Sequence, residues 1–332
     1  MAKIGIPRTL AYFSYYPFWE TFFSQLGHEV VVSSPTSKAI LDKGVKEAVN
    51  DACIPIKIYH GHVADLAGRV DFIFCPRMVS VRKYGDFGTE TFCPKFLGLP
   101  DMVRLSMSEL PPIIDVRVDL KQGRKAMDQV CQEIGRLLGN PEKEVESAQK
   151  KATAVQKKYD RLLQQEILPD EAMTMALTPG ATPQSSQPVQ PDLKIAVLGY
   201  PYTIYDHYLN VGLLSILRKE NVKVYTQDML RNKTMNKYGQ TLPKNMFWYY
   251  SNRAVNATLY YLDRPDIDGI IHVTAFACGP DSMVDRLMEI ETHRRSKLPF
   301  LSVAIDEHTA ETGVRTRVEA FLDMLRYRRE SL

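Results

Sequence analysis

Short apolar runs alternate with helically spaced apolar positions through the first third of the chain. Each run is rich in Ile, Val or Phe and is bounded by Gly, Pro or polar residues, as in strands buried on both faces. Between the runs, apolar residues recur at helical spacing over residues 13–26, and prolines mark helix starts at Pro35 and Pro55. This alternation predicts a doubly wound α/β unit. Its strands are expected at residues 4–7, 28–33, 70–75 and 112–116.

The second half of the chain repeats this organisation. Its first strand reads Lys-Ile-Ala-Val from residue 194, where the first unit reads Lys-Ile-Gly-Ile from residue 3. A helix is expected over residues 206–219. The longest apolar strand is followed by a break at Cys278 and a further helical pattern. The strands of this unit are expected at residues 194–199, 222–226, 267–273 and 299–305.

The segment between the two units differs from both. Residues 124–166 are charged and helically spaced, whereas residues 177–192 are rich in Thr, Pro, Gly, Ser and Gln, the composition of a flexible linker. We therefore predict two Rossmann-like, mainly parallel α/β units joined by helices, with a cleft between them. The expected parts are an N-terminal domain (1–120), a helical connector (121–176), a linker (177–192) and a C-terminal domain (193–332).

Composition narrows the class of protein. The 332 residues are 45% hydrophobic and 24% charged, which is ordinary for a globular protein, and a net charge of +3 does not favour nucleic acid. No apolar run reaches the ~20 residues that span a bilayer. The chain opens directly on a strand pattern, so we expect no signal peptide and a cytoplasmic location. Five cysteines in that compartment indicate metal or redox chemistry before disulfides.

Three of the cysteines share one local pattern. Cys53 is followed by Ile-Pro, Cys93 by Pro and Cys278 by Gly-Pro, so each sulfur is expected beside the free N–H groups of a helix start. Such groups stabilise a thiolate or a cluster sulfide. Separations of 40 and 185 residues exclude a compact ferredoxin run or a zinc ribbon, so a shared site requires the fold to assemble it. Small core residues are the alternative reading.

The remaining candidates carry weaker signals. Cys75 ends an apolar strand and precedes a proline. It could be a fourth ligand, but we prefer the interpretation that it completes the strand. Cys131 lies among apolar neighbours in a predicted helix and is expected to pack there. Glu307 and His308 follow the last strand and are candidates for proton handling, with capping by their neighbours Asp306 and Thr309 as the alternative. No His or Asp stands at recognisable spacing to make Cys278 a nucleophile, and no glycine-rich nucleotide motif is present.

Several segments resemble one family. They are Ile-Gly-Ile-Pro-Arg (4–8), Tyr-Tyr-Pro-Phe-Trp (15–19), Asp-Ala-Cys-Ile-Pro-Ile-Lys (51–57), His-Gly-His-Val (60–63), Cys-Pro-Lys-Phe-Leu-Gly-Leu-Pro-Asp (93–101) and Asp-Glu-His-Thr (306–309). The chain resembles the 2-hydroxyacyl-CoA dehydratase activase-related family, a domain of unknown function of the DUF2229 type, distantly related to the dehydratase subunits. In those subunits, paired α/β domains hold a [4Fe–4S] cluster through three cysteines and leave one iron open.

The resemblance implies a site and a partner. Cys53, Cys93 and Cys278 would hold a [4Fe–4S] cluster, with Cys75 as a possible extra ligand, and an ATP-dependent iron–sulfur activase would supply low-potential electrons. The resemblance also implies electron transfer or reductive, dehydratase-like chemistry. Because related reductases carry a double-cubane cluster, the resemblance leaves open whether the cluster is single or double. Two alternatives stay open: a two-lobed small-molecule binding module with structural cysteines, and a zinc protein. A homodimer is expected because most oligomers are twofold.

Overall fold

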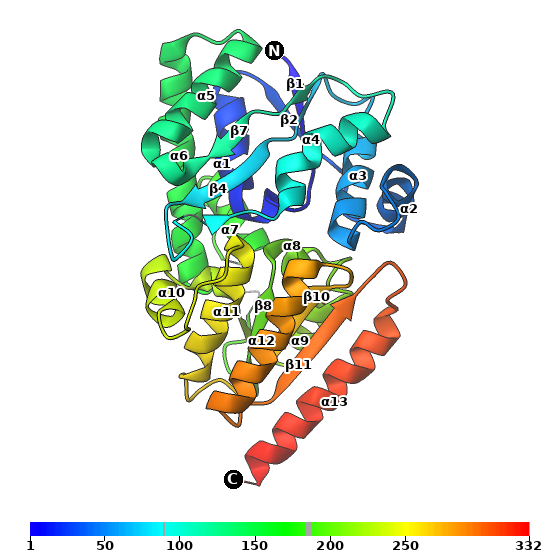
Figure 1. The fold of residues 1–332 in the computed structure, drawn as a ribbon, viewed down its shortest axis with the longest axis vertical. Helices are drawn as coiled ribbons and strands as arrows, with labels where there is room; N and C mark the ends of the chain where they lie inside the picture. Colours follow the sequence, from blue (N-terminus) through cyan, green and yellow to red (C-terminus); the bar gives the residue numbers. More distant parts are fainter. Residues whose placement is uncertain (89, 184–186, 332) are drawn as a thin grey trace.

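The computed structural model describes residues 1–88, 90–183 and 187–331, and it consists of two α/β lobes. Figure 1 shows the N-terminal lobe in blue and cyan above the C-terminal lobe in yellow to red, with green connecting helices along one side. Each lobe contains a four-stranded sheet whose pairings are all parallel, flanked by helices. The predicted fold class is therefore confirmed. No helix in the described ranges is long and apolar enough to cross a membrane.

The sheet of the N-terminal lobe has the strand order β2-β1-β3-β6. Three of its strands lie inside the ranges expected from the sequence, and the first begins one residue before its expected range. The strands are β1 (Lys3–Ile6), β2 (Glu29–Val32), β3 (Phe72–Phe74) and β6 (Ile113–Ile114). The helices are α1 (Tyr12–Gln25), α2 (Lys38–Glu47), α3 (Ile54–Leu66) and α4 (Pro94–Ser106).

A second, smaller sheet in this lobe was not expected. It has the order β5-β4-β7, with β5 antiparallel and β7 parallel to β4. Residues 82–91 looked like a loop because they are polar and contain glycine, yet their last two described residues form β5. The strands are β4 (Arg77–Arg82), β5 (Glu90–Thr91) and β7 (Arg117–Asp119).

Three helices connect the lobes after the short 3₁₀ turn η1 (Leu120–Gln122). The charged segment is helical as predicted, but it divides at Gly139, which ends the first helix in a left-handed conformation (φ 76°). The second of these helices packs against α1, and Tyr159 donates a hydrogen bond to the Phe13 carbonyl there at 2.6 Å. The helices are α5 (Arg124–Leu138), α6 (Glu142–Gln164) and α7 (Pro169–Leu177). Within the predicted linker, residues 184–186 lie outside the described residues.

The C-terminal lobe has the strand order β11-β10-β8-β9. Its central strand β10 is buried along all seven residues, as expected of a strand covered by helices on both faces. The strands are β8 (Leu193–Gly199), β9 (Val222–Tyr225), β10 (Gly269–Ala275) and β11 (Phe300–Ile305). The helices are α8 (Pro201–Tyr205), α9 (Leu213–Lys219), η2 (Gln227–Met229), α10 (Asn232–Gly239), α11 (Tyr249–Leu262), α12 (Gly279–Arg295) and α13 (Glu311–Glu330).

The helix predicted over residues 206–219 is wrong in its first half. The Asp206 carboxylate accepts the backbone N–H groups of Tyr208 and Leu209, which forms a turn instead of a helix. Val211 and Gly212 then adopt positive φ angles of 52° and 74°, and the helix starts only after them. Local side-chain bonding therefore outweighed the apolar periodicity.

Polar contacts join the two lobes beside β5. The Glu90 side chain, 2% exposed, accepts from Arg82 Nε at 2.5 Å and from Asn252 Nδ2 of α11 at 2.7 Å. Arg82 also donates to Asn236 of α10 at 2.8 Å, and Thr91 forms a parallel bridge with Trp248. The N-terminal lobe is thus hydrogen-bonded to the C-terminal lobe through buried polar groups.

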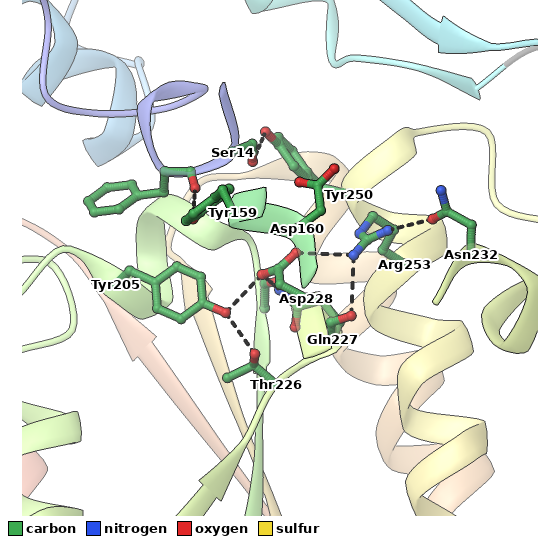
Figure 2. A network of polar contacts seen from close by, with 12 residues as sticks. Ser14, Tyr159, Asp160, Tyr205, Thr226, Gln227, Asp228, Asn232, Tyr250 and Arg253 are labelled. Atoms are coloured by element: carbon green, nitrogen blue, oxygen red, sulfur yellow. Dashed lines mark hydrogen bonds and ion pairs between the residues drawn. The ribbon is translucent and has the colours of Figure 1, made fainter. Parts of the chain in front are cut away.

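A second polar network lies in the C-terminal lobe, next to Ser14 of α1 and Tyr159 of α6 (Figure 2). Arg253 of α11 contacts Asp228 at 3.1 Å and Asn232 at 3.0 Å, and Tyr205 donates to the other Asp228 oxygen at 2.8 Å. Tyr250 meets Ser14 of α1 at 3.2 Å. A cavity of about 240 Å³ adjoins this network and is lined by α1, β4, α6 and α11, so it contacts both lobes and the connector.

Removing the Glu90 carboxylate tests the contact between the lobes. We expect Glu90→Ala to lower the free energy of unfolding by about 3 kcal/mol, because it leaves a largely buried Arg82 and Asn252 without their acceptor. Glu289→Ala is the matched control, since its partner Arg286 is 68% exposed, and it should change stability by less than about 0.5 kcal/mol. Urea denaturation measures both. Equal losses in the two variants would contradict this role.

Candidate functional site

Three cysteines occupy the same structural position in three different helices. Cys53 is the N-cap of α3, Cys93 of α4 and Cys278 of α12, and each helix has proline within its first two positions. Proline in the first turn fixes the helix start and leaves the following N–H groups free. Burial raises the pKa of the Cys93 thiol, and the backbone N–H groups of Lys95 and Phe96 at its sulfur partly oppose this rise. The local pattern predicted from the sequence is present at all three positions.

The fold brings these three thiols together from both lobes. Cys53 and Cys93 belong to the N-terminal lobe and Cys278 to the C-terminal lobe, yet each of the first two raises the pKa of Cys278 electrostatically. Lys95 Nζ lies 3.7 Å from the Cys53 sulfur and provides positive charge there. The Cys53 and Cys278 residues are only 8% and 9% exposed. The thiols therefore share one largely buried environment between the lobes.

Burial favours the protonated form of two of these thiols, those of Cys93 and Cys278. Burial is the largest cause that raises the pKa of Cys278, and Asp281 adds to it; burial likewise raises the pKa of Cys93. At Cys278 desolvation therefore outweighs the helix N-terminus, which by itself would favour the thiolate. Cationic metal bound among the three sulfurs would reverse this balance, since coordination removes the thiol proton.

A single metal ion and an iron–sulfur cluster require different arrangements of their ligand side chains. Within residues 1–88, 90–183 and 187–331, no group of three or more His, Cys, Asp or Glu side chains is arranged to hold a metal ion. A single zinc ion requires its ligands around one centre. Cysteines that hold an iron–sulfur cluster bind different iron atoms and stand farther apart. Thiols suit either kind of group, and metal analysis distinguishes the two.

The other two cysteines lie apart from this group. Cys75 is fully buried at the end of β3, where its partners are Tyr59, Arg104, Asp115 and Arg77, and burial raises its pKa to about 12. Cys131 is fully buried in α5. Neither has another cysteine among its electrostatic partners. The geometry favours the packing role that the sequence indicated for both.

Glu307 and His308 reach the site to different extents. Glu307 accepts from Lys57 Nζ at 2.7 Å, and this hydrogen bond lowers the pKa of Glu307. Because Lys57 lies one turn after Cys53, the contact brings the C-terminal lobe against the start of α3. His308 is exposed on the same loop. Asp306 and Thr309 bond to each other and close this loop, whereas Ala310 is the N-cap of α13.

The histidines that follow Cys53 are hydrogen-bonded within the protein. His62 is fully buried, with Ser33 at 2.8 Å from Nδ1 and Thr36 at 3.0 Å from Nε2, and burial lowers its pKa to about 4. His60 Nδ1 lies 2.8 Å from the Ile56 carbonyl. With both nitrogens of His62 engaged, this ring is a structural group and not a metal ligand.

A buried charged group beside Cys278 was missed by sequence reasoning. His272, inside β10 and 0% exposed, lies 2.6 Å from Asp285 and 3.5 Å from Asp281 of α12. Burial alone would lower the pKa of His272, but the two carboxylates outweigh it and raise the pKa to about 9. The sequence does contain a pattern that could have predicted this group: His272 lies in an apolar strand, and Asp281 and Asp285 follow it four residues apart, on one face of the next helix.

The protein is thus a two-lobed α/β protein in which both lobes place cysteines at helix N-termini. The sequence profile of the CoA enzyme activase uncharacterised domain (DUF2229) matches residues 3–230, and the chain belongs to this family. A second profile, the 2-hydroxyglutaryl-CoA dehydratase D-component, matches residues 207–325. The resemblance drawn from the cysteine segments is thereby confirmed, and the chain is related to dehydratase components and their activases.

Other comparisons add little. No curated protein matches the chain. A solved FpvC mutant from Pseudomonas aeruginosa aligns over 98% of this chain and 99% of its own at 14% identity and a TM-score of 0.25. A ZnuA crystal structure aligns over 95% and 97% at 10% identity and a TM-score of 0.29. Likenesses this slight carry no conclusion about fold or function.

Substitution of His272 should change how stability depends on pH. Its folded pKa of about 9 lies above the ordinary 6.5, so its contribution is complete below pH 6.5 and is lost as pH rises through 9. We expect His272→Gln to cost about 3 kcal/mol at pH 6 and much less at pH 10. Urea unfolding at both values measures the difference, with His293→Gln at the exposed end of α12 as control. A pH-independent loss would contradict the ionic role.

Proposed function

We propose that this protein binds a [4Fe–4S] cluster through Cys53, Cys93 and Cys278 at the boundary between its lobes. The observation that carries the proposal is the meeting of three thiols, each at the proline-marked start of a different helix and two of them buried. Packing alone accounts for burial of a cysteine but not for the convergence of three from both lobes. Three thiolates leave one iron free for an exogenous ligand or for a bridge to a second cluster.

The protein's own groups suit a negatively charged centre. When bound, the cluster would supply one-electron chemistry at low potential. Backbone N–H groups at the helix starts and the Lys95 ammonium offset negative charge at the sulfurs. The Lys57–Glu307 pair holds the two lobes together one turn from Cys53. Glu307, ionised and bonded, serves as a hydrogen-bond acceptor more readily than as an acid.

We further propose that the electrons come from a separate ATP-dependent activase of the iron–sulfur type. Membership of the CoA enzyme activase domain family supports an activase partner. The sequence contains no phosphate-binding glycine motif, so ATP hydrolysis is assigned to that partner. The reaction class is electron transfer or reductive chemistry of the 2-hydroxyacyl-CoA dehydratase kind, in the cytosol, where thiols stay reduced. The match to a dehydratase component supports this choice.

Metal content after anaerobic purification tests the proposal. We expect a brown protein with about four irons per chain and broad absorption from the cluster. Cys53→Ser, Cys93→Ser and Cys278→Ser should each lower iron content severalfold. Cys131→Ser and Cys75→Ser are controls, because both residues are more deeply buried than the three proposed ligands but lie outside the group, and both variants should retain iron.

Two results would overturn the proposal. A colourless protein that takes up no iron on anaerobic reconstitution would favour a small-molecule binding module with structural cysteines. Stoichiometric zinc in place of iron would favour a zinc protein. EPR of the reduced protein distinguishes a [4Fe–4S] cluster from adventitious iron.

A further inference from the structure

The cavity of about 240 Å³ where α1, α6 and α11 meet is lined by ionisable side chains. They are one guanidinium, that of Arg253, and two carboxylates, those of Asp228 and Asp160, all labelled in Figure 2. None of the described residues that line this cavity is a cysteine. The cavity is therefore a separate place from the proposed cluster site, and its charged groups need an explanation of their own.

Arg253 is bonded into the wall of this cavity but keeps unused hydrogen-bond donors. Its side chain, 11% exposed, donates to Asn232 at 3.0 Å and to Asp228 at 3.1 Å. A third N–H group donates to the Gln227 carbonyl at 3.2 Å. A guanidinium carries five N–H groups, so two of them have no acceptor among the described residues. Those two can bind an anionic group placed in the cavity.

The α6 wall of the cavity offers acceptors. Gln156 Nε2 donates to the Ser14 carbonyl at 3.0 Å and to Asp160 Oδ1 at 2.9 Å, and this fixes the orientation of the amide because only its nitrogen can donate. Gln156 Oε1 is therefore an acceptor, and it is buried without a hydrogen-bond partner in the part of the chain that the structure describes. Within the same residues, Asp160 has no ion-pair partner, although Arg253 lines the same cavity.

The unused groups define a ligand by its charges. The free N–H groups of Arg253 attract a carboxylate, whereas Asp160 and Gln156 Oε1 attract an ammonium group. Polar groups without partners are unfavourable in a buried place, so a molecule that carries both charges is favoured over one that carries a single charge. The volume of about 240 Å³ lies below the ~300–1,000 Å³ of sites for drug-sized ligands and suits a small molecule.

We propose that this cavity binds a small zwitterion, an α-amino acid, with its carboxylate at Arg253 and its ammonium group at Asp160 and Gln156 Oε1. Binding here is independent of the proposed cluster. The walls come from α1 and β4 of the N-terminal lobe, from α6 of the connector and from α11 of the C-terminal lobe. A bound amino acid contacts all three parts of the protein and so stabilises the arrangement in which they are joined.

Isothermal titration calorimetry of the full-length protein tests the class of ligand. L-alanine carries both charges, whereas propionate lacks the ammonium group and ethylamine lacks the carboxylate. We expect L-alanine to bind at least ~10-fold more tightly than either single-charge probe, because it alone fills both sets of groups. L-alanine should also raise the melting temperature as its concentration increases. Equal affinities for L-alanine and either other probe would overturn the assignment of a zwitterion.

Substitutions test where the two charges bind. Asp160→Asn removes a charge at unchanged size, so it should weaken L-alanine binding at least ~10-fold and leave propionate binding unchanged. Glu146→Gln is the control, since it removes an exposed carboxylate of the same helix outside the cavity, and it should change neither affinity. Arg253→Lys should weaken the binding of both L-alanine and propionate, with circular dichroism to show that this variant is folded.

Three results would contradict the inference. They are no binding of glycine, L-alanine or L-serine at ~10 mM, an unchanged affinity for L-alanine in Asp160→Asn, or an equal loss of affinity in Glu146→Gln. Iron content is a separate measurement, so the proposed function stands or fails independently of these results. Protein that binds L-alanine but takes up no iron would overturn the proposed function alone.

Discussion

The buried carboxylate of Glu90 is the constraint on which the site depends. It joins Arg82 of its own lobe to Asn252 of the other, and three residues later the chain reaches Cys93. A charge at 2% exposure is tolerated only while its partners are in place, so the lobes are held at one separation. Lys57 and Glu307 provide a similar contact beside Cys53. The cysteines meet because these polar contacts fix how the lobes pack.

Buried groups of opposite effect on the thiols meet at this boundary between the lobes. The thiols are buried near Asp281, which is unfavourable to thiolates, whereas helix N-termini and Lys95 favour them. Behind Cys278, the imidazolium of His272 lies between Asp281 and Asp285 and compensates their charge. Burial and Asp281 thus favour a neutral Cys278 thiol next to this compensated ion group, and a cationic metal bound there would favour its thiolate.

The sequence predicted correctly the features that depend on neighbouring residues in the chain, such as the helix starts after the cysteines. Proline after each cysteine predicted the helix starts, because proline acts on its own neighbours. Glu90 and His272 could not be found this way, since their roles depend on partners from other elements: Glu90 meets a residue 162 positions away. The interrupted helix after Asp206 was missed because a side chain there competes with the backbone for hydrogen bonds.

The division of the thiols between lobes, two and one, has a consequence for biosynthesis. A nascent chain emerging from the ribosome presents Cys53 and Cys93 long before Cys278 exists, because 185 residues separate the last two. With the proposed ligand set, the early lobe holds only two sulfurs, too few to retain the cofactor. Loading then waits for completed translation and for docking of the second lobe. Cofactor retention would thereby distinguish finished molecules from truncated ones.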